Sequence, residues 1–151
     1  MSLKISTGLR NYMLTTGSLK AALESGTGGV ITLYSGTEPA TADDDVTGAT
    51  AIVTFTVGGD GSTPLTFETP AANGSLVKAT AETWQGTVAS TGTANFYRHY
   101  IQSDTGALST TALRVQGTVG IGGSDLNMTD NSLTATDVET VDYYSINLPE
   151  V

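Results

Sequence analysis

The sequence predicts a mainly β protein, an antiparallel β-sandwich or jelly roll with a short helical segment at its N-terminus. Three observations predict this class. The 151 residues include 27 threonines and 18 glycines, which favour pleated strands and tight turns respectively. Short stretches of period-two alternation recur between turn signals. Strands do not alternate with helices, which disfavours a parallel α/β fold.

Residues 1–29 are predicted to form the helical segment. Ser6 or Thr7 can cap a first helix, and Gly17 followed by Ser18 is typical of a helix end and a new cap. Apolar residues fall at helical spacing in both parts: Leu9, Tyr12 and Met13 in the first, and Leu19, Ala22 and Leu23 in the second. The pattern therefore predicts two short helices, or one helix with a break at Gly17.

Residues 30–151 are predicted to form the β-sandwich domain. Strands are expected at 30–35, 51–57, 65–68, 75–79, 82–89, 93–103, 112–119, 133–136 and 138–148. In the last of these, alternation places Val141, Tyr143 and Ser145 on one face. Glycine-rich turns and loops separate the strands, and the sequence contains no repeat of fixed period.

The net charge of −9 is distributed unevenly. Residues 1–24 carry a balance of +2, whereas the rest of the chain carries −11. Because an acidic body repels phosphate, no nucleic-acid partner is expected. The sequence has no apolar run long enough to cross a bilayer and no secretory signal pattern, so no membrane partner is expected and synthesis in a cytoplasm is predicted.

The sequence predicts a protein that is not an enzyme and has no cofactor. The absence of cysteine excludes thiol nucleophiles and Cys-ligated zinc. The single histidine, His99, lies within the aromatic strand of residues 96–101 and is interpreted as structural or exposed, since no local signature supplies a catalytic triad. A hydrolase is a minor alternative, which would require a cleft with paired carboxylates of perturbed pKa.

Acidic side chains gather in two loops, Asp43–Asp45 and residues 125–130. In the second, Asp125, Asn127 and Asp130 resemble the opening of a helix–loop–helix calcium loop. The sixth position of that pattern would be glycine and is Asp130, and the twelfth would be glutamate and is Thr136. These three residues are weak calcium candidates, and no metal site is predicted.

Six short stretches of turn and strand pattern, spread along most of the chain, resemble one class of proteins. They are Lys4–Asn11, Val30–Ala40, Ser90–Phe96, Gly117–Gly120, Ser124–Met128 and Thr140–Tyr143. In these stretches the chain resembles small structural proteins of tailed-bacteriophage virions, most of all capsid decoration (cement) proteins. The longer stretch 60–73 departs from that pattern. The resemblance supplies no catalytic residues.

The resemblance implies a virion protein on the capsid exterior that binds the major capsid protein, forms a homo-oligomer and stabilises the head. Binding only the assembled shell would stabilise it by linkage. The residues predicted to dock on a partner are Leu9, Arg10, Met13, Leu19 and Lys20. The open alternative is that their apolar face packs on the protein's own sandwich. Deleting residues 1–24 is expected to abolish capsid binding and to leave a folded β domain.

The second hypothesis is a tail, neck or fibre component that binds a receptor or carbohydrate. In that case Trp84, Tyr97 and Tyr100 would stack on sugars and would have to be exposed together. Packing in the core is the commoner role of such aromatic side chains.

Overall fold

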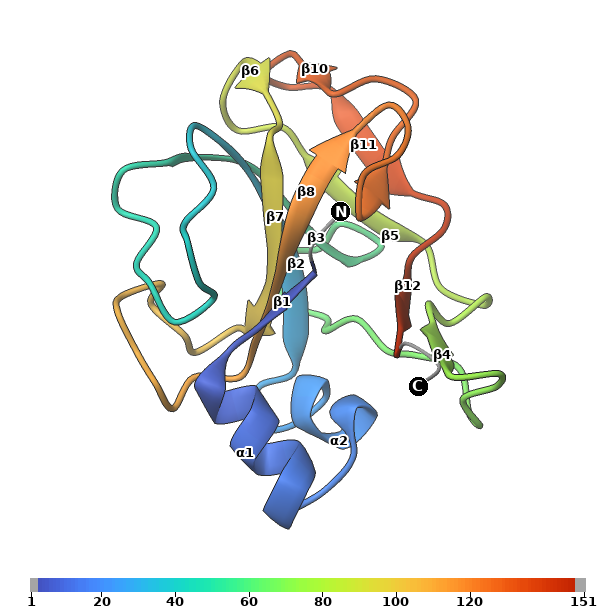
Figure 1. Cartoon of the computed structure of the whole chain (residues 1–151). Helices are drawn as coiled ribbons and strands as arrows, with labels where there is room; N and C mark the ends of the chain where they lie inside the picture. The colour runs from blue at the N-terminus through green and yellow to red at the C-terminus, as the bar shows by residue number, and fades with distance from the viewer. Residues whose placement is uncertain (1–2, 149–151) are drawn as a thin grey trace.

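The computed structural model describes residues 3–148 and confirms a mainly β fold with two short helices near the N-terminus (Figure 1). The elements in chain order are β1 (Lys4–Ile5), α1 (Thr7–Thr15), α2 (Leu19–Leu23), β2 (Gly29–Ser35), β3 (Thr50–Val57), β4 (Ser75–Val77), β5 (Trp84–Thr87), β6 (Gly92–Thr93), β7 (Phe96–Ile101), β8 (Arg114–Gly120), β9 (Leu126–Asn127), β10 (Ser132–Leu133), β11 (Val138–Val141) and β12 (Ser145–Asn147).

Most strands of the described residues belong to one curved sheet with the order β1-β8-β7-β2-β3-β5-β11. These neighbours are antiparallel, and β9 adds to β8 in parallel. Two small antiparallel pairs, β10–β6 and β12–β4, complete the β structure. In Figure 1 the central strands stand nearly upright, whereas β5 and β11 cross behind them at an angle.

The two helices begin where the sequence predicts. The side chain of Ser6 accepts a hydrogen bond from the Leu9 amide at 3.2 Å, and that of Ser18 accepts one from the Ala21 amide at 3.1 Å. Each serine therefore satisfies one of the free amides at a helix start. The first helix ends just before Gly17, as predicted.

One face of the sheet forms the core. Strand register aligns Ile31, His99 and Val115 in a row across β2, β7 and β8, and all three are buried. An aromatic cluster packs around this row and consists of Phe67, Trp84, Tyr97 and Tyr144. Burial of these large side chains provides most of the hydrophobic stabilisation expected for this region.

The opposite face of the sheet is polar yet covered. Its central row runs through Thr54, Thr32, Arg98, Gln116 and Lys4 on five adjacent strands. The segments 36–49 and 102–113 cover this face and lie on the left of Figure 1. They are joined by backbone hydrogen bonds, among them Val46 N–H to the Gly106 carbonyl at 3.1 Å. The sheet is therefore buried on both faces near its centre.

The N-terminal segment is built into the same fold. Strand β1 pairs with β8, and Leu9, Leu19 and Leu23 belong to the hydrophobic core. Because removing residues 1–24 would expose that core, we expect the deletion to destabilise the β domain and not to leave it intact. The helices are part of the packing of the sheet.

The C-terminal strand predicted over 138–148 is divided into β11 and β12. Residues 142–144 lie between the two strands, and period-two alternation fails there. Val141 is buried, Tyr143 is 67 % exposed, and its neighbour Tyr144 is fully enclosed. The prediction that Val141 and Tyr143 share one face is therefore wrong. The interruption turns Tyr144 into the aromatic cluster, where it packs against Phe67 and Trp84.

Candidate binding groove

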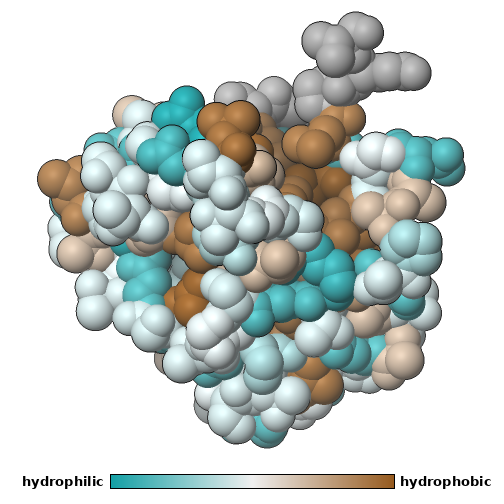
Figure 2. All heavy atoms as spheres, turned by 90° about the horizontal axis from the view of Figure 1, so that it is seen from below, coloured by the Kyte–Doolittle hydropathy of each residue, from teal (hydrophilic) through white to brown (hydrophobic). Residues whose placement is uncertain are grey.

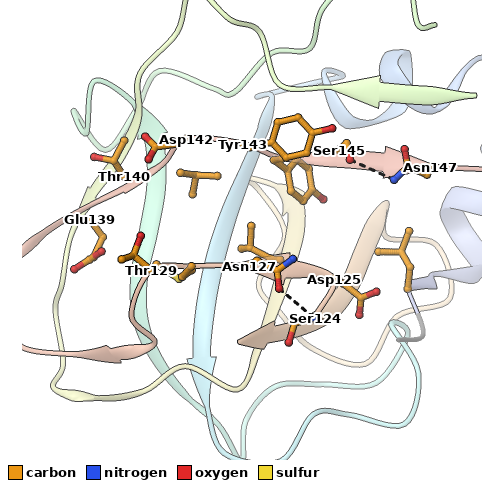
Figure 3. Close-up of a pocket in the computed structure, with 15 residues that line it drawn as sticks. Ser124, Asp125, Asn127, Thr129, Glu139, Thr140, Asp142, Tyr143, Ser145 and Asn147 are labelled. Carbon is orange, nitrogen blue, oxygen red and sulfur yellow. Dashed lines mark hydrogen bonds between the residues drawn. The ribbon is translucent and has the colours of Figure 1, made fainter. Parts of the chain in front are cut away.

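A groove of about 800 Å³ opens between β9 and the segment that contains β11 and β12 (Figure 3). Figure 3 shows Ser124, Asp125, Asn127 and Thr129 along one wall. The other wall carries Glu139, Thr140, Asp142, Tyr143, Ser145 and Asn147. We refer to this site, with its lining residues, as the acidic groove.

Both walls of the acidic groove contain strands that pair on one side only. Within residues 3–148, β11 pairs with β5 alone and β9 pairs with β8 alone. A strand at the edge of a sheet leaves alternate N–H and C=O groups free to pair with another chain. The groove thus lies where the curved sheet stops, between two strand edges.

The floor of the acidic groove is apolar. Leu126, Val141 and Tyr144 line it and also belong to the core, so they are held in place from below. Leu3 and Met128 add further apolar surface at the lining. A rigid apolar floor with polar walls is the usual composition of a site that takes a ligand or a peptide.

The walls of the acidic groove carry negative charge. Asp125, Glu139 and Asp142 line it, and none of its lining residues within the described chain is Lys or Arg. Burial raises the pKa of Glu139, and repulsion from Asp137 and Asp130 raises it further. These carboxylates therefore concentrate a negative potential that favours a cationic occupant.

Asp125 and Glu139, two carboxylates of the lining, do not form a pair. Figure 3 shows Glu139 and Asp125 toward opposite ends of the groove. Asp125 Oδ2 also accepts hydrogen bonds from both the amide and the hydroxyl of Thr118, each at 2.9 Å. Its carboxylate holds the start of β9 against β8.

The three weak calcium candidates do not converge. Asp125 bonds to Thr118, Asn127 accepts from the Ser124 amide at 3.1 Å, and Asp130 accepts from the Ser132 amide at 2.8 Å. Within residues 3–148 no group of three or more acidic or histidine side chains could hold a metal ion. These side chains instead stabilise local turns.

The predicted docking residues are divided between the core and the surface. Leu9 and Leu19 are buried in the core, which is the alternative left open by the sequence, and Met13 packs partly against it. Lys20 pairs with Glu24 and donates to the Phe67 carbonyl at 2.8 Å, whereas Arg10 is exposed. Leu9 and Leu19 are therefore not available to a partner.

The helical end faces the viewer in Figure 2. That surface is mostly polar, with apolar side chains in separate groups. Leu14, at 81 % exposure, is the large apolar residue that α1 leaves in solvent. Scattered single apolar residues are normal on a protein surface and do not define an interface.

The three aromatic residues proposed to bind sugar do not form a shared surface. Trp84 and Tyr97 are fully buried in the aromatic cluster. Tyr100 lies on the other face of β7, where its hydroxyl is 2.9 Å from that of Thr32. Because stacking on a sugar ring needs an exposed aromatic face, this version of carbohydrate binding is wrong for these residues.

His99 is buried, so of the two roles left open by the sequence, structural or exposed, the structural one holds. It is fully buried, and its ring stacks on Phe67 with the ring centres 5.5 Å apart. Neither ring nitrogen has a hydrogen-bond partner in the described chain. Burial lowers the pKa of His99 to about 3. The ring is therefore neutral at pH 7. The backbone of Gly29 approaches it so closely that a Cβ there would lie 2.6 Å from Nε2.

A second polar region lies on the opposite face of the sheet, and we call it the arginine cluster: Arg98, Arg114, Asp104 and Gln116. Arg114 is fully buried and binds Asp104 with two hydrogen bonds, of 2.6 and 2.7 Å. It also donates to the carbonyls of Ala42 and Ala107, at 3.2 and 2.7 Å. One side chain thus joins the two covering segments to β8.

Arg98 completes the arginine cluster without a carboxylate partner. Its guanidinium donates to the Gln116 side chain at 3.2 Å and to the Asp44 carbonyl at 3.0 Å. Burial, followed by the repulsion of Arg114, lowers the pKa of Arg98. Gln116 in turn donates to the Pro39 carbonyl at 2.9 Å. The hydrogen bonds of this region hold the segments 36–49 and 102–113 on the sheet.

Sequence reasoning missed the acidic groove as a unit. It identified Asp125, Asn127 and Asp130 as weak calcium candidates and treated 138–148 as one strand, so the two walls were not related to each other. The available signal was the run of acidic residues from Asp125 to Asp142 in segments with few bases. That signal does not reveal which strand edges remain free.

Comparison with known proteins gives no match, whether to a family model, to a curated protein or to a solved structure. None of the helices in residues 3–148 is long and apolar enough to cross a membrane.

Proposed function

We propose that this chain is a non-catalytic structural protein of a tailed-phage virion that decorates the capsid exterior and stabilises the head. The observation that carries the binding role is the acidic groove, an open site between two free strand edges on an otherwise internally bonded body. The virion setting comes from the resemblance in sequence. The partner in this proposal is the major capsid protein.

The physical basis of the proposed role is linkage. A protein that binds assembled shell and not free subunits stabilises the shell by the free energy of that binding. Such a protein benefits from a preformed surface, because ordering loops on binding would reduce its affinity. The arginine cluster supports this proposal, since it holds the long segments 36–49 and 102–113 in one arrangement before any partner arrives.

The proposed docking surface differs from the one expected from sequence. Leu9 and Leu19 are core residues, so the helices contribute to shell binding only through the fold that they stabilise. The acidic groove replaces them as the contact site. A homo-oligomer on the shell remains part of the proposal, with its subunit number to be measured by sedimentation.

The test is binding of the purified chain to undecorated phage shells. We expect the chain to co-sediment with the shells, to appear on their outer face by cryo-electron microscopy and to raise the temperature at which they disrupt. Density on a tail or neck of intact virions would instead favour the alternative of a tail, neck or fibre component. Absence from both shells and virions would contradict a virion role.

A further inference from the structure

We propose that the acidic groove binds an extended, basic segment of a partner protein, which adds as a strand to the free edge of β11. This inference deepens the proposed function by giving the site a ligand class. It rests on the proposed function only for the identity of the partner, which is a subunit of the phage shell. The geometry of the groove itself is independent of the virion setting.

The backbone of β11 gives the first argument. Within the described residues this strand, Val138–Val141, is hydrogen-bonded to β5 only, and its residues Glu139, Thr140 and Val141 line the groove. An extended peptide can complete such an edge with main-chain hydrogen bonds, which supply affinity without requiring a particular sequence. Four residues of strand span about 13 Å, so a segment of roughly four to six residues matches the wall.

The side chains of the groove give the second argument. In an added strand, alternate side chains point to opposite faces. One set would meet the accessible apolar side chains of the lining, which are Leu3, Met128 and Tyr143, and the other set would meet the acidic walls. The occupant is therefore expected to alternate apolar residues with lysine or arginine.

Charge complementarity favours another protein, and not a second copy of this chain, as the occupant of the groove. Asp125, Glu139 and Asp142 line the groove without a basic neighbour in the lining, and the pKa of Glu139 is raised. A second copy offers few free cations, because Lys4, Lys20 and Arg114 are already engaged in ion pairs. A basic segment of another protein would supply the cations that pair with these carboxylates, which a second copy would not.

An exposed aromatic residue of the lining agrees with a covered site. Tyr143 is 67 % exposed and lines the groove directly. Aromatic residues at an interface edge commonly become anchors when a partner binds.

The probe for this inference is a fluorescent six-residue peptide in which lysine and arginine alternate with valine. Anisotropy titration into the full chain is expected to give saturable binding that weakens as salt is raised from 0.05 to 0.5 M. A peptide with glutamate in place of the basic residues is expected not to bind. No saturable binding of the basic peptide up to about 1 mM, the weakest affinity that such an assay follows, would overturn the inference.

Charge variants locate the peptide. The double variant Glu139→Gln/Asp142→Asn is expected to bind the basic peptide about tenfold more weakly, since two wall charges are removed. The matched control is Asp45→Asn/Glu68→Gln, which removes two carboxylates outside the groove lining. Equal losses in the two double variants would show that only the overall charge matters and would overturn the site.

N-methylation of the peptide backbone tests whether the peptide pairs with β11 as an added strand. Two versions of the peptide carry N-methyl groups, one on the odd and one on the even residues. Because alternate amides of a strand face opposite edges, one version should keep its affinity and the other should lose most of it. Equal affinities would mean that the backbone does not pair with β11 and would overturn strand addition.

The two proposals fail in different experiments. Peptide binding to the groove without any shell binding supports the groove and contradicts the virion role. Shell binding that persists in Glu139→Gln/Asp142→Asn, with no peptide binding, supports the virion role and overturns the groove inference. A dimer that the double variant dissociates in sedimentation would make a second copy the occupant and would also overturn it.

Discussion

The arginine cluster and the acidic groove are two polar regions of one sheet, and they treat charge in opposite ways. In the arginine cluster, buried guanidinium groups donate to a carboxylate, to amide oxygens and to backbone carbonyls of the same chain. In the acidic groove, the carboxylates of Glu139 and Asp142 line an open site without a basic residue in the lining. The difference separates charge that maintains a fold from charge left for a partner.

This comparison also shows why burial alone does not identify a functional site. Arg98 has a lowered pKa and lies close to Arg114, a pattern often associated with catalytic sites. Its hydrogen bonds, however, all go to groups that hold the segment 36–49. The more informative feature is whether neighbouring groups already satisfy the charge. By that criterion the groove is the better candidate.

The largest effect is expected at the centre of the arginine cluster. Arg114→Met should lower the free energy of unfolding by about 3–5 kcal/mol, because it leaves the carboxylate of Asp104 and several carbonyls without their donor. Urea denaturation measures this change. Arg10→Met, at an exposed position, is the control and should change stability by less than about 0.5 kcal/mol. Similar small losses in both variants would contradict the clamping role of Arg114.

His99 extends the comparison to a buried polar side chain outside both regions. Its ring nitrogens have no hydrogen-bond partner in the described chain. Its pKa is about 3 in the folded chain and about 6.5 when unfolded. As pH falls below about 6.5 the unfolded state binds a proton first, so stability is lost by up to about 1.4 kcal/mol per pH unit until about pH 3. Above pH 6.5 this residue contributes no pH dependence.

The variant His99→Phe should therefore flatten the acid side of the stability curve. Relative to its own value at pH 7, it should retain about 3 kcal/mol more stability at pH 4 than the original chain does. Urea denaturation across pH 4–8 measures this difference. Any packing cost of the larger ring shifts both ends of the curve equally. Parallel curves for the two proteins would contradict the low pKa of His99.

Gly117 connects the groove wall to the core, and its substitution should have an intermediate effect. A Cβ at this position would lie 2.8 Å from the Asp125 Cβ and 2.9 Å from Tyr97. Gly117→Ala should therefore cost about 1–3 kcal/mol, since β9 or Tyr97 must shift. Gly122→Ala, where a Cβ would meet nothing within 4 Å, is the control. Thermal unfolding compares them, and equal melting temperatures would contradict the close packing of this wall.

The smallest effect on stability is expected in the acidic groove itself. Glu139→Gln/Asp142→Asn should leave the free energy of unfolding unchanged or raise it by up to about 0.5 kcal/mol, because it relieves repulsion from Asp137 and Asp130. Urea denaturation at pH 7 measures this value beside the loss of peptide binding. A marked destabilisation would mean that these carboxylates support the fold, as the arginine cluster does, and would remove the contrast between the regions.

Local signals in the sequence predicted the elements well where short-range chemistry decides them. Ser6 and Ser18 cap helices because a serine side chain reaches the amide three residues ahead. The strand of residues 51–57 is predicted by β-branched residues in alternation and is found at Thr50–Val57. The division of residues 138–148 was missed, because the turn of Tyr144 into the aromatic cluster depends on Phe67 and Trp84, which are distant in sequence.

By itself, the sequence determined the mainly β class, the two capped helices and the acidic character of the body, since these follow from residue type and spacing. Only the tertiary structure decided which charges are satisfied. In the sequence, Arg98 and Arg114 lie in predicted strands that give no sign of their burial. They are buried because the segments 36–49 and 102–113 fold over them. The acidic groove exists because the curved sheet ends with β9 and β11 facing one another. Free strand edges are a property of pairing between distant segments, and local sequence does not encode them.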